Sequence, residues 1–207
     1  MIDKVVRSML ALAFVSSLGC NAFAESADSE DYKKADELIG KKSFGEAIPL
    51  LDKAIKADPK HAEAYMDRAL CNFHEKNYKK VVEDCKEVAG LESAHEVTKR
   101  QAYMMSAGAQ NALGEYDAAI QSCGSAIALA PHASLCFTDR AFAYQNLKKY
   151  DEALRDVNEA IKLDPKHASN YELRAAVYEA LARQDRNKHA EMLKNHTKPS
   201  QLGSSHL

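Results

Sequence analysis

A short pattern that returns four times along the chain constrains its fold more than any other feature. It occupies Phe44 to Ile48, Tyr78 to Val82, Tyr116 to Ile120 and Tyr150 to Leu154. Each copy opens on an aromatic residue and has Ala or Val three positions later, and the aromatics lie 34, 38 and 34 residues apart. A period in this range is typical of arrays built from small repeated units, each too small to bury its own apolar face.

Two further landmarks keep the same period. A second compact residue follows seven positions after the first, two helical turns along the same face, at Ala54, Val88, Ala126 and Ala160. Proline then follows at one matching offset in three units, at Pro59, Pro131 and Pro165. Proline ends one helix and suits the first turn of the next, so each pattern predicts a helix followed by a sharp turn.

A second helical stretch precedes each aromatic residue, and its small residue recurs in step at Ala35, Ala69, Ala107, Ala141 and Ala175. Each unit is therefore predicted to be helix, short turn, helix. The arrangement resembles the tetratricopeptide repeat (TPR) over about residues 28 to 182. This resemblance implies an all-α, right-handed superhelix of antiparallel helix pairs, with about four full repeats plus a C-terminal helix pair or cap.

The landmarks divide the chain into an acidic linker at 25–30, a TPR array at 31–196 and a flexible tail at 197–207. The repeats fall at about 28–61, 62–99, 100–133 and 134–167, with a partial repeat or cap at 168–196. Helical hairpins are expected at 30–57, 61–90, 96–129 and 133–163, then one helix at 167–182 and a polar last helix at 184–195. In the second unit Ser93 replaces the expected proline and four residues are added, which predicts a longer helix or a kink around 91–99.

The first 24 residues have the features of a signal peptide. Lys4 and Arg7 precede an uncharged, mostly apolar run from Met9 to Leu18, and Ala22 to Ala24 form an A-x-A cleavage site. Export to the periplasm is expected, and the run is too short for a typical membrane span. Two alternatives stay open: an uncleaved membrane anchor, in which case the protein contacts a membrane, and lipidation of Cys20.

The family resemblance assigns ligand contact to the concave groove lined by the first helix of each unit. Counting helical faces from the alanines gives sixteen candidates for a peptide-binding groove: Tyr32, Asp36, Ile39, Met66, Asp67, Leu70, Phe73, Met104, Met105, Asn111, Thr138, Asp139, Phe142, Gln145, Glu172 and Glu179. A surface that is apolar at its centre and acidic at intervals suits an amphipathic or mildly basic partner segment. The alternative for each apolar member is packing between neighbouring helices.

Asp67 to Ala69 and Asp139 to Ala141 resemble units of cytosolic chaperone-binding TPR proteins, which grip an acidic carboxyl-terminal tail. Those proteins use Asn where Asp67 and Asp139 stand here, so a carboxylate clamp is not supported. Arg68, Arg140 and Arg174 are instead expected to pair with acids along the interfaces between units.

Four cysteines follow the signal segment, and they form two pairs across interhelical turns. Cys71 with Cys85, and Cys123 with Cys136, are candidate disulfides in an oxidising compartment. The alternative is four buried thiols that act as small apolar residues. No metal site is expected, because Cys71 and His74 have no second ligand pair at zinc-like spacing.

Composition and motifs exclude several functions. The chain holds 28 basic and 30 acidic residues, and this mild acidity argues against a nucleic-acid partner. No nucleophile elbow, phosphate-binding loop or Cys-x-x-Cys motif occurs, so no enzyme activity, cofactor or small-molecule substrate is expected. The sequence predicts a protein-interaction scaffold or adaptor in the periplasm. The alternatives are a structural subunit of an envelope complex and a thiol-exchange protein.

Overall fold

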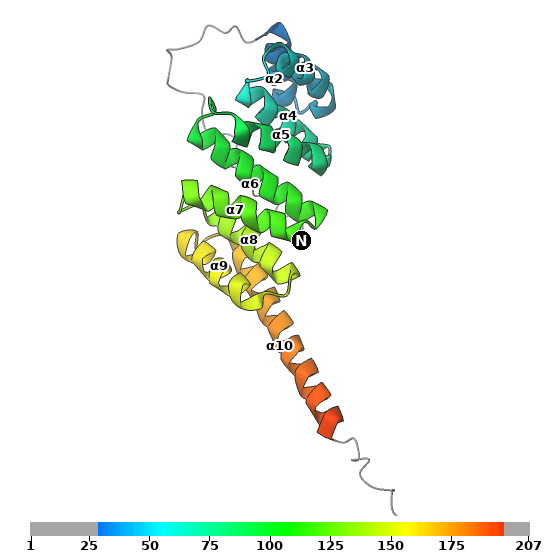
Figure 1. The fold of residues 1–207 in the computed structure, drawn as a ribbon, viewed down its shortest axis with the longest axis vertical. Helices are drawn as coiled ribbons and strands as arrows, with labels where there is room; N and C mark the ends of the chain where they lie inside the picture. The colour runs from blue at the N-terminus through cyan, green and yellow to red at the C-terminus, as the bar shows by residue number, and fades with distance from the viewer. Residues whose placement is uncertain (1–28, 197–207) are drawn as a thin grey trace, which may run out of the picture.

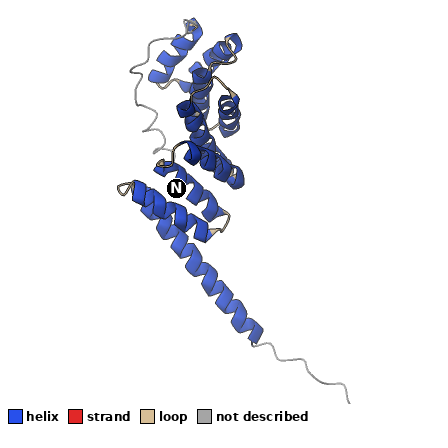
Figure 2. Cartoon of the chain, turned by 60° about the vertical axis from the view of Figure 1, so that its left-hand side comes forward, coloured by secondary structure: helices blue, strands red, loops and turns tan. Residues whose placement is uncertain are grey.

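The computed structural model describes residues 29–196, and every regular element in that range is a helix (Figures 1 and 2). Four hairpins follow one another: α2 (Glu30–Gly40) with α3 (Phe44–Ala57), α4 (Ala62–His74) with α5 (Tyr78–Gly90), α6 (Glu96–Leu113) with α7 (Tyr116–Leu129), and α8 (Ser134–Asn146) with α9 (Tyr150–Leu163). Helix α10 (Ala168–His196) ends the array. The four predicted hairpins are confirmed to within one residue, whereas the signal segment, residues 25–28 of the linker and the tail lie outside the described residues.

The turn inside each hairpin has the same geometry. One residue adopts a left-handed conformation, at Lys42, Lys76, Gly114 and Lys148. The backbone N–H of the next residue donates to the carbonyl five positions earlier, as from Ser43 to Leu38 at 2.9 Å. This is the Schellman motif, which satisfies the last carbonyls of a helix and reverses the chain. Only the third hairpin has glycine at the left-handed position.

The turn between hairpins depends on proline where proline is present. At Asp58 and Asp164 the carboxylate accepts a hydrogen bond from the backbone N–H two residues later, beside the intervening proline. The second junction lacks proline and is non-helical from 91 to 95. The added residues lengthen α6 to 18 residues, so the predicted longer helix is observed.

Small side chains let the helices approach closely. The landmark alanines Ala35, Ala69, Ala107 and Ala141 are all 0% exposed. On the second helices, Ala47, Val81, Ala119 and Ala153 are also 0% exposed. These residues form the continuous core between layers that the repeat pattern predicts.

The end of the array differs from the prediction in one respect. A helix break was expected near Arg183, but α10 continues without interruption for 29 residues and extends beyond the stacked hairpins (Figure 1). Its first half buries Leu173 and Val177 against α8 and α9. From Arg183 onward nearly every side chain is exposed. A separate last helix would need a buried face to offset the cost of ending α10 and starting a new helix, and this segment has no such face.

None of the helices from α2 to α10 is both long enough and apolar enough to cross a membrane.

Candidate protein-binding face

The first helices of the hairpins form an inner layer. Helices α2, α4, α6, α8 and α10 each contact the next helix of this set, whereas contacts among α3, α5, α7 and α9 are sparse. Closer neighbours on one side of a stack make it curve toward that side. The first helices therefore line the concave side, and we call the surface they present the inner face.

Twelve of the sixteen predicted groove residues are at least partly accessible. Asp36, Glu172 and Glu179 are exposed, and nine are half-buried: Tyr32, Ile39, Met66, Asp67, Leu70, Met104, Met105, Phe142 and Gln145. The half-buried apolar members come from α2, α4, α6 and α8, while exposed acids lie on α2 and α10. The accessible set therefore has an apolar middle and acidic ends.

The remaining four predicted groove residues are internal, which corrects the sequence-based assignment. Phe73 is 5% exposed and packs edge-on against Tyr78 at 5.4 Å between ring centroids. Asn111 is buried, and its side-chain amide donates to the backbone carbonyl of Asp139 at 3.0 Å. These residues stabilise contacts within and between hairpins and are not available to a ligand.

Thr138 and Asp139 are likewise buried on α8. The Thr138 hydroxyl donates to the side-chain carbonyl of Asn170 on α10 at 2.6 Å. Asp139 is 1% exposed, and its Oδ1 has no hydrogen-bond partner among the described residues. Burial raises the pKa of Asp139 to about 8, so its carboxyl group is largely protonated at neutral pH.

The acidic end on α2 and α4 is organised around Asp67. Its Oδ2 accepts a hydrogen bond from the Tyr32 hydroxyl at 2.8 Å, and Tyr32 also lies against the His61 ring with centroids 4.6 Å apart. Burial raises the pKa of Asp67 to about 6, and the charge of Asp36 acts in the same direction. Three acidic groups, counting Glu63, therefore influence one another at this end of the inner face.

Arg68 and Arg140 pair with acids, as predicted, but of these pairs only that of Arg68 with Asp52 crosses between units; the others join the two helices of one hairpin. Arg68 donates to Asp52 on α3 at 2.6 Å and to Asp84 on α5 at 2.5 Å. Arg140 donates to Asp156 on α9 through Nε at 2.7 Å and Nη2 at 2.9 Å.

The third predicted arginine differs in the nature of its partner. Arg174 donates to Asn158, an amide rather than an acid, at 3.2 Å. The sequence analysis did not identify the acidic partners Asp84 and Asp156. Each lies 16 residues after its arginine, Arg68 or Arg140, and this repeated spacing could have indicated them.

Neither candidate disulfide is formed. Cys71, Cys85, Cys123 and Cys136 are free and buried. Burial raises the pKa of Cys71 and of Cys136 to about 12, and the pKa values of the other two thiols are also raised. A thiol-exchange site needs the opposite properties, an accessible thiol of lowered pKa.

No group of three or more metal-binding side chains gathers anywhere in residues 29–196. Cys71 and His74 therefore belong to no such group. His74 instead stacks on Phe44 of α3, with ring centroids 3.8 Å apart.

Comparison with known proteins agrees with the geometry. Models of the tetratricopeptide repeat family match residues 32–90, 101–132 and 134–167. No curated protein sequence matches the chain.

Several solved structures have the same fold. A crystal structure of MamA protein is 20% identical, with a TM-score of 0.68 over 86% of this chain and 96% of that one. MamA from Desulfovibrio magneticus RS-1, from residue 41 to its end, is 15% identical, with a TM-score of 0.68 over 86% of this chain and all of that one. YrrB, described as a TPR protein with an unusual peptide-binding site, is 17% identical, with a TM-score of 0.63 over 98% of this chain and 96% of that one. At these identities the likeness establishes the fold alone.

Proposed function

The chain belongs to the tetratricopeptide repeat family, and from that premise we propose that it is a non-catalytic scaffold that binds a segment of another protein on its inner face. The partner segment is amphipathic and mildly basic. One observation carries the proposal: the accessible part of the inner face combines half-buried apolar side chains with acidic residues and includes no Lys or Arg among the predicted positions.

The apolar middle supplies anchoring contacts. Met66, Leu70 and Met105 are half-buried on α4 and α6, and Phe142 is half-buried on α8. Methionine side chains adapt their shape to a ligand, and aromatic or aliphatic anchors in partly enclosed positions contribute most of the energy of such interfaces. An amphipathic helix with apolar residues at i, i+3, i+4 and i+7 matches a surface of this kind.

The acidic ends set the preference for a basic partner. Asp36 and Asp67 lie at one end and Glu172 and Glu179 at the other. Opposite charges raise the association rate and suppress wrongly charged partners more than they raise affinity. YrrB is described as having a peptide-binding site, which supports a peptide ligand for this fold without identifying it.

Fluorescence anisotropy with labelled amphipathic peptides tests the proposal. Two helical peptides would share one apolar face, with Lys and Arg on the polar face of the first and Glu on that of the second. We expect the basic peptide to bind at least about tenfold more tightly than the acidic one. The double variant Met66→Asp, Phe142→Asp should abolish binding while circular dichroism shows it to be helical.

Leu129→Asp is the matched control, since Leu129 is an exposed apolar residue on α7, outside the inner layer. It should leave binding unchanged. Equal binding by wild type and the Met66→Asp, Phe142→Asp variant would rule out the inner face as the site.

We also propose that the protein acts in the periplasm. Support comes from the basic start, the short apolar run and the A-x-A site within residues 1–24. N-terminal sequencing of the chain isolated from a periplasmic fraction should begin at Glu25. Retention of Met1 in a membrane fraction would favour the uncleaved anchor.

A further inference from the structure

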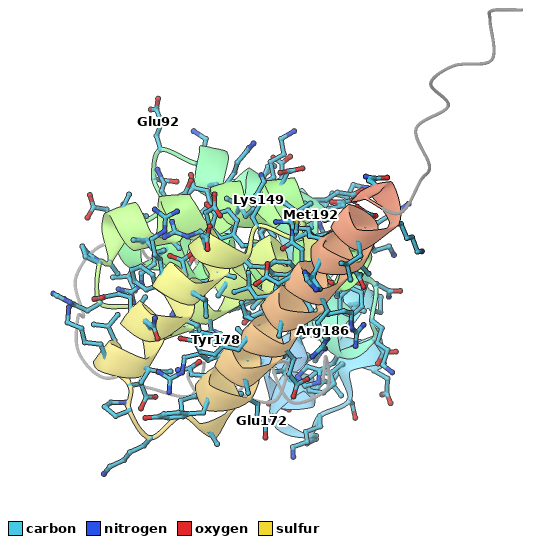
Figure 3. The ribbon with its side chains drawn as sticks, turned by 90° about the horizontal axis from the view of Figure 1, so that it is seen from below. Glu92, Lys149, Glu172, Tyr178, Arg186 and Met192 are labelled. Carbon is cyan, nitrogen blue, oxygen red and sulfur yellow. The ribbon has the colours of Figure 1, made fainter. Side chains whose placement is uncertain are left out.

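Helix α10 has the sequence of a first helix, but within residues 29–196 no second helix follows it as α3, α5, α7 and α9 follow the other first helices. In the four hairpins the landmark alanine is fully buried, as at Ala107 and Ala141. The equivalent Ala175 on α10 is exposed. No described helix lies in front of α10 when the array is seen from its C-terminal end (Figure 3).

An apolar stripe runs along this uncovered face. Tyr171, Ala175, Tyr178 and Ala182 follow one another at spacings of four, three and four residues. Met192 lies fourteen residues, or two heptads, beyond Tyr178 and so shares its side of a paired helix. Tyr171 is 41% exposed, Tyr178 53% and Met192 55%, among the most exposed large hydrophobic residues of the described chain. Spacings of three and four residues are those of helix pairs that wrap around each other.

Helix α10 is much longer than the other first helices. Its 29 residues span about 43 Å, whereas the other first helices have 11 to 18 residues. The first half packs on the array through Leu173 and Val177. The second half, 183–196, projects into solvent and is long enough to act as the second helix of a hairpin, because those helices have 13 or 14 residues.

The two halves of α10 carry opposite charges. Residues 168–182 hold Glu172 and Glu179 against one basic residue, Arg174. Residues 183–196 hold four basic residues, Arg183, Arg186, Lys188 and Lys194, against two acidic ones. Antiparallel pairing of two α10 helices sets the acidic half of each against the basic half of the other, whereas parallel pairing sets like against like.

We propose that two copies of this chain pair through antiparallel α10 helices, so that residues 183–196 of each copy form the missing second helix of the other. Ala182 of the two copies meets near the twofold axis, where its small side chain lets the helices approach. Tyr171 and Tyr178 of one copy lie against the half of the other that carries Met192. The interface is isologous. It occupies the α10 end of each inner face and leaves the part formed by α2, α4, α6 and α8 open.

Sedimentation velocity of the full chain tests the pairing. Wild type should form a concentration-dependent dimer, and Tyr178→Glu and Met192→Glu should each raise the dimer dissociation constant by more than about tenfold. Val97→Glu is the matched control, because Val97 is 54% exposed on α6, away from the stripe, and should leave the constant unchanged. A wild-type monomer, or a dimer unaffected by both α10 variants, would overturn the proposal.

Cross-linking tests the orientation. With Cys20 replaced by Ser throughout, Ala182→Cys should form an intermolecular disulfide under mild oxidation, because both copies bring this position to the axis. Ala190 is also exposed on α10 but lies far from its counterpart in an antiparallel pair, so Ala190→Cys should stay reduced. The reverse result would contradict antiparallel pairing, and neither result depends on peptide binding at the inner face.

Discussion

Arg68 and Asp84 join the two helices of the second hairpin through three hydrogen bonds of 2.5 to 3.2 Å. The carboxylate of Asp84 is almost completely buried, with 4% of its side chain exposed, and Arg68 also reaches Asp52 on the preceding hairpin. One guanidinium group therefore couples the first hairpin to both helices of the second. Its loss would leave a buried carboxylate without its strongest partner.

We predict that Arg68→Met lowers the free energy of unfolding by about 3 kcal/mol, because an unpaired buried charge is costly. Urea unfolding followed by circular dichroism measures the change. Lys162→Met is the control, since Lys162 and Glu159 form an exposed pair at 3.2 Å that should contribute less than about 0.5 kcal/mol. The double variant Arg68→Met, Asp84→Leu should recover part of the loss, and an Arg68→Met variant as stable as wild type would contradict this account.

Three lysines have a left-handed backbone conformation, and replacing one of them by glycine is predicted to stabilise the protein. Lys76 has φ of 61° at the turn of the second hairpin, a conformation that glycine adopts without the steric cost that a Cβ imposes. Lys76→Gly should therefore raise the free energy of unfolding by about 1 kcal/mol.

The third hairpin provides the converse experiment. Gly114 has φ of 78°, and a Cβ added there would meet nothing within 4 Å, so only the backbone conformation is at issue. Gly114→Lys should destabilise by about the same 1 kcal/mol. Thermal melts of both variants would refute the backbone argument if the two changes had the same sign.

Protection of the buried thiols is a further prediction. Because burial raises the pKa of Cys71 and Cys136 to about 12, their thiolate fraction at pH 8 is about a thousandfold below that of an exposed thiol. Mass spectrometry after brief alkylation should find all four thiols of the array unmodified in the native protein and modified in urea. Rapid native alkylation of any of them would revive the thiol-exchange alternative.

Much of the fold could be predicted because the recurring small residues occur where neighbouring helices pack closely. An alanine such as Ala69 recurs because the neighbouring helix approaches too closely for a larger side chain, and the hairpin boundaries follow from that register. The continuity of α10 could not be predicted in this way. A polar sequence such as that of residues 183–196 is compatible both with a separate capping helix and with an extension of α10. The two differ only in whether the segment buries a face against the array, and in the structure it buries none.

The inner face was less predictable for a physical reason. The alanine register gives the direction of a side chain but not the distance to the next hairpin. Asp67 and Asp139 occupy equivalent positions, yet Asp67 is half-buried beside the Tyr32 hydroxyl and Asp139 is completely enclosed near Asn111. The first helix that precedes each residue also differs, since α2 has 11 residues and α6 has 18, and the alanine register alone does not give this difference.

Asp139 predicts a pH dependence of stability. Its pKa is raised to about 8 in the folded protein from an ordinary value of 3.8, so between these values the folded state binds a proton that the unfolded state has released. Stability contributed by this site is therefore greatest below pH 4 and decreases as the pH rises toward 8. Each titrating proton changes the free energy of unfolding by about 1.4 kcal/mol per pH unit, so we expect a loss of about 2 kcal/mol between pH 6 and pH 8.

Asp139→Asn isolates this contribution, because asparagine has nearly the same shape and does not titrate. Burial raises the pKa of Asp67 to about 6, so Asp67 also titrates near the lower end of this window. It does so in wild type and variant alike, and the difference in stability between the two proteins therefore reports Asp139. Urea unfolding at pH 6, 7 and 8 should show that the variant becomes more stable relative to wild type as the pH rises. A constant difference between the two proteins across this range would mean that Asp139 ionises normally in the folded state, which its complete burial without a cationic partner makes energetically unfavourable.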